Sequence, residues 1–232
     1  MALVKYGGGI IQMSGSVAGN THARNRSGNY IRARTKPINP NTAKQILVRA
    51  CLANLTTRWA QTLSPAQRAA WNLYASSVAM KNRLGEVCYF TGMNHYVRSN
   101  AWFARMSRTI VDDGPVIFEL PAQDPTMSIS ISEATQQVTM TFDDQLAWCS
   151  EDNAMLVILQ SQGQNPQREF FDGPWTGRSA KVGAAGVPVT SPLDYTSITV
   201  VSELQRVWAK FRILRADGRL SEAFRADCFC GA

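Results

Sequence analysis

The sequence has little of the chemistry that most active sites require. It contains only two histidines, His22 and His95, in 232 residues, so a histidine-based triad or metal cage has few groups to draw on. The glycine run at 7–9 does not belong to a GxxxxGK[ST] phosphate-binding loop. The acidic pairs at 143–144 and 151–152 lack the spacing of a calcium-binding loop. We therefore predict no catalytic residues, no metal and no cofactor.

Long apolar runs and paired cysteines are also missing. No stretch approaches the roughly 18 to 20 apolar residues of a membrane span, and the first residues lack the apolar run of a secretion signal. We expect no membrane contact and a cytosolic origin. The five cysteines include no CxxC pair, so a zinc site is not predicted and reduced, buried thiols are expected. Cys228 and Cys230 are the one local cluster and are candidates for an intersubunit disulfide.

Acidic residues are absent from the first 85 positions. Residues 1–85 carry twelve basic side chains and no acidic one, a net charge of +12. Residues 86–115 carry three of each sign, and residues 116–232 carry nine basic and fourteen acidic side chains, a net charge of −5. This separation favours contact between the first part and a negative partner, either nucleic acid or an acidic protein surface, including that of another copy.

Residues 1–40 are predicted to form an extended basic arm. They are rich in Gly, Ser, Asn and Arg, and so few large apolar residues cannot offset the entropy of ordering. Residues 30–35 alternate and can add as a strand to a partner's sheet. Six side chains suit contact with phosphates or with a partner's carboxylates. These are Arg24, Arg26, Tyr30, Arg32, Arg34 and Lys36.

Residues 41–114 are predicted to form a small helical domain of about three helices. The first helix is indicated by an apolar stripe with a period of four residues, made of Leu47, Cys51, Leu55 and Trp59. The second starts with a capping box, in which Ser64 is the N-cap, Pro65 the first helical residue and Gln67 the third. Thr91 can cap the third, and a turn cluster at 112–115 ends the domain.

Residues 115–232 are predicted to form a β domain, which makes the chain a segregated α+β protein. Short β-branched runs alternate with turn residues, and residues 127–131 and 138–142 alternate strictly between apolar and polar. About seven short strands fit an immunoglobulin- or fibronectin-like β-sandwich, with a small barrel as the alternative. Trp175 lies in a Gly/Pro-rich loop and is the best candidate for an exposed interface anchor.

Two longer motifs stand out in the first half of the chain. The first, G-x-Y-x-R-x-R-x-x-P-x-N-P-x-T, runs from Gly28 to Thr42. The second, L-[ST]-x-x-Q-R-x-A-W, runs from Leu63 to Trp71. Both resemble motifs of uncharacterised structural proteins from tailed bacteriophages and prophages. Immunoglobulin-like modules are common on phage capsid, neck and tail proteins, and the C-terminal domain is similar in this respect. The resemblance implies a virion component with no catalytic residues to carry over.

The resulting hypothesis is a non-enzymatic virion protein that assembles in the host cytoplasm. It would be an auxiliary capsid (cement or decoration) protein or a head-to-tail neck component. As a homo-oligomer, it would bind capsid, portal or tail subunits through the basic arm. The first alternative is a nucleic-acid-binding assembly or packaging factor that uses the same arm on DNA. The second is host-surface or glycan binding by the β-sandwich around Trp175.

Overall fold

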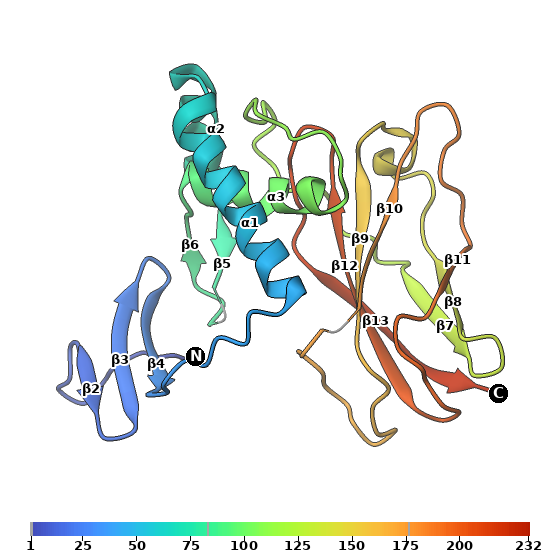
Figure 1. Ribbon diagram of the computed structural model, residues 1–232, viewed down its shortest axis with the longest axis horizontal. Coiled ribbons are helices and arrows are strands. Elements are labelled where there is room, and N and C mark those ends of the chain that lie inside the picture. The colour runs from blue at the N-terminus through green and yellow to red at the C-terminus, as the bar shows by residue number, and fades with distance from the viewer. Residues whose placement is uncertain (1, 83, 176) are drawn as a thin grey trace. The chain divides into compact units, whose positions relative to one another are not determined.

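The fold, taken from a computed structural model, is mixed α+β and is described for residues 2–82, 84–175 and 177–232. The chain divides into two compact units, residues 1–97 and 98–232. The first holds a small antiparallel sheet followed by helices, and the second holds a curled seven-stranded sheet (Figure 1). Within the described residues, no helix is both long enough and apolar enough to cross a bilayer.

Residues 2–33 fold into a four-stranded antiparallel sheet, where an extended arm was predicted. Its spatial order is β1 (Ala2–Leu3), β4 (Gly28–Ala33), β3 (Asn20–Asn25), β2 (Gly15–Val17). Two tight turns allow the pairing, one with Ala18 at φ +48° and one with Gly28 at φ +118°, which are backbone conformations found mostly in turns. Hydrogen bonds between the strands satisfy the backbone N–H and C=O groups, and the amino-acid composition alone did not indicate this pairing. Of the segment predicted at 30–35, residues 30–33 lie in strand β4, which pairs within its own chain.

The predicted helix starts in the first unit are confirmed. α1 (Ala43–Thr57) begins at Thr42, and α2 (Pro65–Ser77) begins at Ser64 with the predicted capping box. The Ser64 hydroxyl accepts the Gln67 N–H at 3.2 Å, and the Gln67 side-chain oxygen accepts the Ser64 N–H at 2.9 Å. A π-helical turn, Arg58–Thr62, follows α1, and a short hairpin of β5 (Met80–Lys81) and β6 (Val87–Cys88) follows α2.

The core of the first unit is aromatic. Trp71 and Tyr74 of α2 are buried, and Trp71 meets Tyr96 edge-on with ring centroids 5.6 Å apart. Tyr96 lies on α3 (Gly92–Arg105) and also contacts Trp59 at 5.4 Å. α1 contributes a single buried side chain, Leu55. The apolar stripe predicted along α1 is therefore buried at one position only.

The second unit is built on one curled sheet of seven strands (Figure 1). In spatial order these are β10 (Gly177–Val182), β9 (Met155–Gln160), β12 (Arg206–Leu214), β13 (Phe224–Gly231), β7 (Ser128–Ser132), β8 (Gln137–Thr141) and β11 (Leu193–Thr196). Neighbours are antiparallel except β13 and β7, which pair in parallel at Cys230 and Ile131. The sequence predicted a sandwich of two separate sheets. The structure has one continuous sheet instead, because β13 is long enough to pair with both β12 and β7.

One core lies inside the curl of this sheet. Side chains of the group β10-β9-β12-β13 and of the group β7-β8-β11 face each other there, including Ile129, Val138, Met140, Ile158, Val207 and Phe211. The other face of β9 and β12 is covered by Phe103 of α3, which packs with Met155, Val157 and Leu214. Arg98 fixes α3 further by donating to the carbonyls of Leu220 and Ser221, each at 3.0 Å.

α3 ends in a Schellman motif that has serine where glycine is usual. The Arg108 N–H reaches the Phe103 carbonyl at 2.8 Å and the Ser107 N–H reaches the Ala104 carbonyl at 3.3 Å, with Ser107 at φ +53°. A side chain in this left-handed conformation costs about 1 kcal/mol or more. Ser107→Gly should therefore raise the free energy of unfolding of the second unit by about 1 kcal/mol, measured by urea denaturation. Ser107→Ala is the neutral control, and a Gly variant less stable than wild type would contradict this account.

Candidate binding surfaces

A polar, cationic face lies on the N-terminal sheet. Thr21 of β3 pairs with Arg32 of β4, and Ser16 of β2 pairs with Thr21. Since paired residues of neighbouring strands lie on the same side of a sheet, these three side chains share one face. Alternation along the chain adds Tyr30 and Arg34 to that face. We call these five residues, Ser16, Thr21, Tyr30, Arg32 and Arg34, the basic face.

The residues of the basic face are positioned by backbone pairing. The Arg34 N–H donates to the Gly19 carbonyl at 2.8 Å, which continues the ladder beyond β4. The Ser16 and Thr21 hydroxyls lie 3.1 Å apart and hydrogen bond to each other. Arg32 and Arg34 are exposed. Two guanidinium groups beside two hydroxyls form an arrangement that suits either phosphate oxygens or carboxylates.

The turn between β3 and β4, together with Lys5 after β1, is anchored to the β5–β6 hairpin within the same unit. The Arg26 Nε donates to the Tyr89 carbonyl at 2.7 Å, and the Asn82 amide donates to the Ser27 carbonyl at 3.2 Å. Lys5 forms an ion pair with Glu86 at 2.5 Å. The hydrogen bond from Lys5, followed by that from Asn82, lowers the pKa of Glu86 below its usual value. Arg26, predicted as a contact residue, is therefore engaged inside its own unit.

The cationic charge of the first unit cannot be neutralised internally. Residues 1–97 carry twelve basic side chains and one acidic side chain, Glu86, a net charge of +11. The remaining 135 residues, 98–232, carry twelve basic and sixteen acidic side chains, a net charge of −4. Because Glu86 is bound to Lys5, the arginines of the basic face have no carboxylate available from residues 1–97. They suit an anionic partner.

The structure separates the six predicted contact residues. Tyr30, Arg32 and Arg34 share the basic face, whereas Arg24 lies on the other face of β3 and Lys36 follows in the connector to α1. Ser16 and Thr21 were not predicted. The alternation of side chains along residues 15–33 could have indicated these two residues, but only together with the register of all three strands.

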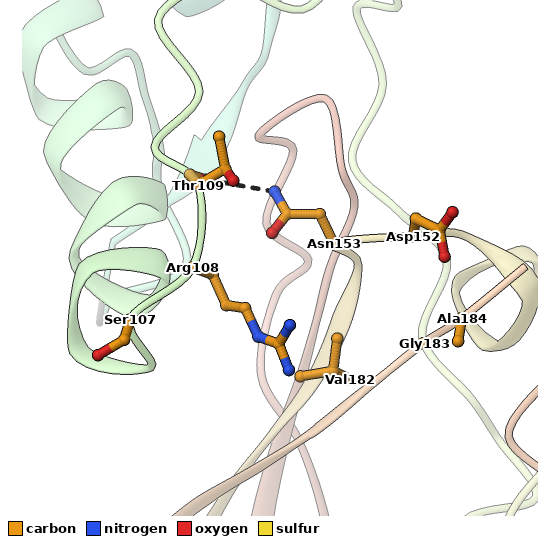
Figure 2. Close-up of a pocket in the computed structure, with 8 residues that line it drawn as sticks. All are labelled: Ser107, Arg108, Thr109, Asp152, Asn153, Val182, Gly183 and Ala184. Carbon is orange, nitrogen blue, oxygen red and sulfur yellow. Dashed lines mark hydrogen bonds between the residues drawn. The ribbon is translucent and has the colours of Figure 1, made fainter.

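A shallow pocket of about 450 Å³ lies between the end of α3 and the loops that flank β9 and β10 (Figure 2). Its polar groups are largely bonded to one another or to the backbone. The Asn153 amide donates to the Thr109 carbonyl at 3.2 Å, and the Asp152 carboxylate accepts the Ala185 N–H at 2.9 Å. Arg108 points along the pocket towards Val182 (Figure 2). The eight lining residues include no histidine or cysteine, and we assign them no catalytic role.

Aromatic rings and cations alternate on the outer face of β12 and β13. The Arg206 guanidinium lies 5.0 Å from the Trp208 ring and 5.3 Å from that of Phe229. Phe171 stacks on Trp208 at 5.6 Å, and Trp175 meets Phe171 edge-on at 5.0 Å. Each cation–aromatic contact contributes about 0.5 to 1 kcal/mol at an exposed site. The loop that carries Trp175 is held onto the sheet by this stack.

Trp175 is thus half-buried, where the sequence predicted an exposed anchor. Lys210 and Arg225 lie over its ring at 5.4 and 5.9 Å. The exposed aromatic side chains of the same region are Phe170, at 68%, and Phe229, at 55%. Loop composition alone did not show that Trp208 would supply a platform for the loop.

Comparison with known proteins gives no family for this chain. It matches no protein-family profile and no curated protein sequence. A solved family 76 glycoside hydrolase from a bovine strain of Bacteroides thetaiotaomicron aligns with a TM-score of 0.29 and 11% sequence identity. The alignment covers 48% of this chain and 21% of the hydrolase. A likeness of this size carries no argument about function.

The two candidate disulfide cysteines face the core. Cys230 is 2% exposed and Cys228 is half-buried beside it. Burial, followed by the nearby charges of Cys230 and Asp227, raises the pKa of Cys228 to about 11. Both thiols are protonated at neutral pH, which slows disulfide formation. The intersubunit disulfide stays a prediction and would require the end of β13 to open. Among the described residues, no three His, Cys, Asp or Glu side chains are grouped to hold a metal ion.

Proposed function

We propose that the protein is a structural subunit of a tailed-phage or prophage virion, an auxiliary capsid or neck component. It binds neighbouring subunits through the basic face. We further propose that the second unit is an immunoglobulin- or fibronectin-like module. The arrangement of its strands in two groups, β10-β9-β12-β13 and β7-β8-β11, around one core supports that assignment.

The proposal rests on the first motif, in which some residues stabilise the fold and others remain exposed. Gly28 makes the β-turn at φ +118°, and Thr42 caps α1. Asn39 accepts a hydrogen bond from Arg49 at 2.6 Å, which holds the connector against α1. Arg32 and Arg34 remain exposed on an ordered sheet. These two arginines are therefore the motif residues best suited to contact another molecule.

The second motif has structural roles at most of its positions. Leu63 and Trp71 are buried, Ser64 and Gln67 form the capping box, and Arg68 donates to the Ala60 carbonyl at 3.3 Å. This division supports a helical unit whose task is to present the basic face. It also supports a structural role over catalysis, because the residues of both motifs serve folding or surface charge.

The alternative of a DNA-binding packaging factor is favoured by one specific observation. The hydroxyls of Ser16 and Thr21 lie beside Arg32, and such side chains commonly contact phosphates. Glycan binding at Trp175 is disfavoured, because Phe171, Lys210 and Arg225 already occupy its ring. A sugar would have to displace these contacts in order to stack.

Purified particles test the proposal. Mass spectrometry of virions made by the phage or prophage that encodes this chain should find it in a fixed ratio to the capsid protein, both in filled particles and in particles without DNA. Its absence from mature particles that otherwise assemble would overturn the proposal. Presence only in packaging intermediates would identify a packaging factor instead.

A further inference from the structure

α1 is apolar on nearly all sides and yet mostly exposed. Nine of its fifteen residues are Ala, Cys, Ile, Leu or Val. Leu55 alone is buried, whereas Ile46 is 54% exposed and Leu47 is 59% exposed. A helix that is hydrophobic all round normally lies in the interior of a protein. The exposed side of α1 carries the apolar residues Ile46, Leu47, Ala50 and Ala53, which we call the α1 strip, together with the polar residues Asn54 and Thr57.

Basic residues border the α1 strip. At 100° per residue, Arg49 lies about 40° before Ala53 at one edge of the strip, and Lys44 lies about 60° beyond Leu47, past Cys51, at the other. The Arg49 guanidinium is also held by the side chains of Asn39 and Asn41. Lys44 and Arg49 are both exposed, and residues 1–85 contain no acidic side chain. Pairing of two α1 helices would therefore bring cations together without a counter-charge. The occupant that fits is an apolar surface bordered by carboxylates.

The second unit carries such a surface at one end of its sheet. Val200 is 86% exposed and Leu204 is 65% exposed. Glu133 and Glu203 lie beside them: the Glu203 N–H donates to the Glu133 carboxylate at 2.8 Å. The Leu204 N–H donates to the Cys230 carbonyl at 3.0 Å, which fixes this loop against the end of β13. We call Glu133, Val200, Glu203 and Leu204 the acidic-rimmed patch.

Backbone strain accompanies the exposure of Leu204. Its φ is +64°, a conformation that is strained for a residue with a side chain and is retained where the surroundings enforce it. Hydrogen bonds on both sides enforce it here, since the Gln205 N–H donates to the Ser202 carbonyl at 3.1 Å. The strained turn holds an apolar side chain in solvent next to Glu203, whose N–H binds the Glu133 carboxylate.

We propose that the α1 strip of one copy docks on the acidic-rimmed patch of a second copy, with Lys44 beside Glu133 and Glu203, while Arg49 keeps its hydrogen bonds to Asn39 and Asn41 and adds positive charge at the other edge. The proposal names the partner surface for subunit packing and rests on the proposed function only in taking assembly as the protein's task. Because the two surfaces differ, the contact is head-to-tail. Repetition of such a contact closes a ring or extends a filament.

A complementation experiment tests the contact on the full chain. Leu47→Glu damages the strip and leaves the patch intact, whereas Leu204→Glu does the reverse. Sedimentation velocity at about 50 and 200 mM salt should show concentration-dependent association of the wild type. Each single variant should associate at least about 10-fold more weakly. An equimolar mixture of the two variants should form 1:1 dimers, because one intact strip meets one intact patch.

Three results would overturn the inference. The first is a wild type that stays monomeric at all concentrations. The second is a Leu204→Glu variant that associates as strongly as the wild type. The third is a mixture that stays monomeric although both variants have the circular dichroism spectrum of the wild type. Val187→Glu, at a residue 80% exposed elsewhere on the second unit, is the matched control and should associate normally. Arg32→Glu with Arg34→Glu separates this contact from the proposed function: self-association should persist, while incorporation into particles is lost.

Discussion

Gly183→Ala is expected to lower the free energy of unfolding of the second unit by about 3 kcal/mol. A Cβ atom at this position would lie 1.9 Å from the Trp148 carbonyl oxygen and 2.8 Å from that of Glu151. Both are backbone atoms, so a rotamer change cannot relieve the clash. Trp148 is 1% exposed and belongs to the core inside the sheet. The strain would therefore spread into the packing between β9 and the loop that follows β10.

Urea denaturation followed by tryptophan fluorescence measures this effect. Gly186→Ala is the matched control three residues further along: a Cβ there meets nothing within 4 Å. It should change the stability by no more than about 0.5 kcal/mol. Equal midpoints for the two variants would show that the backbone of residues 148–151 does not approach Gly183 as described.

The double variant Arg32→Glu with Arg34→Glu is expected to reduce incorporation into particles by about 100-fold. Each arginine in a charge-assisted contact contributes roughly 1.5 kcal/mol or more, and reversal adds repulsion from the anionic partner. Both side chains are exposed, so the midpoint of unfolding should stay close to that of wild type. Quantitative mass spectrometry of purified virions gives the ratio to the capsid protein.

A second pair of substitutions distinguishes the effect of the basic face from the effect of the protein's net charge. Arg24→Glu with Lys36→Glu makes the same change in charge, but Arg24 lies on the opposite face of the sheet and Lys36 in the connector. Incorporation of this control should fall far less. An equal loss for both pairs would mean that overall charge, and not the basic face, determines binding.

Local sequence signals predicted local structure well in the first unit. The Ser64–Gln67 capping box marks the start of α2 because the hydrogen bonds that make it lie within four residues of one another. The burial of Trp71 and Tyr74 also followed from their spacing on one helical face. The apolar spacing of α1 predicted a buried stripe, but Leu55 is its one buried residue. Burial depends on which other surface covers the helix, and spacing within the helix does not show that.

Non-local pairing accounts for the differences. The N-terminal sheet needs turns at residues 18–19 and 26–28 to bring polar strands together, and composition had indicated an arm without order. The curl of the second sheet depends on a parallel contact between Cys230 and Ile131, residues 99 positions apart. The same limit applies to the basic face, since Ser16 joins Arg32 only through the register of three strands.

The mass of the purified protein in solution, measured by light scattering with and without duplex DNA, distinguishes a structural subunit from a DNA-binding factor. A structural subunit that packs on other subunits should give a mass that does not change with DNA and that persists between about 50 and 200 mM salt. A mass increase that requires DNA and falls log-linearly with salt would rule out the structural subunit and identify a nucleic-acid-binding factor.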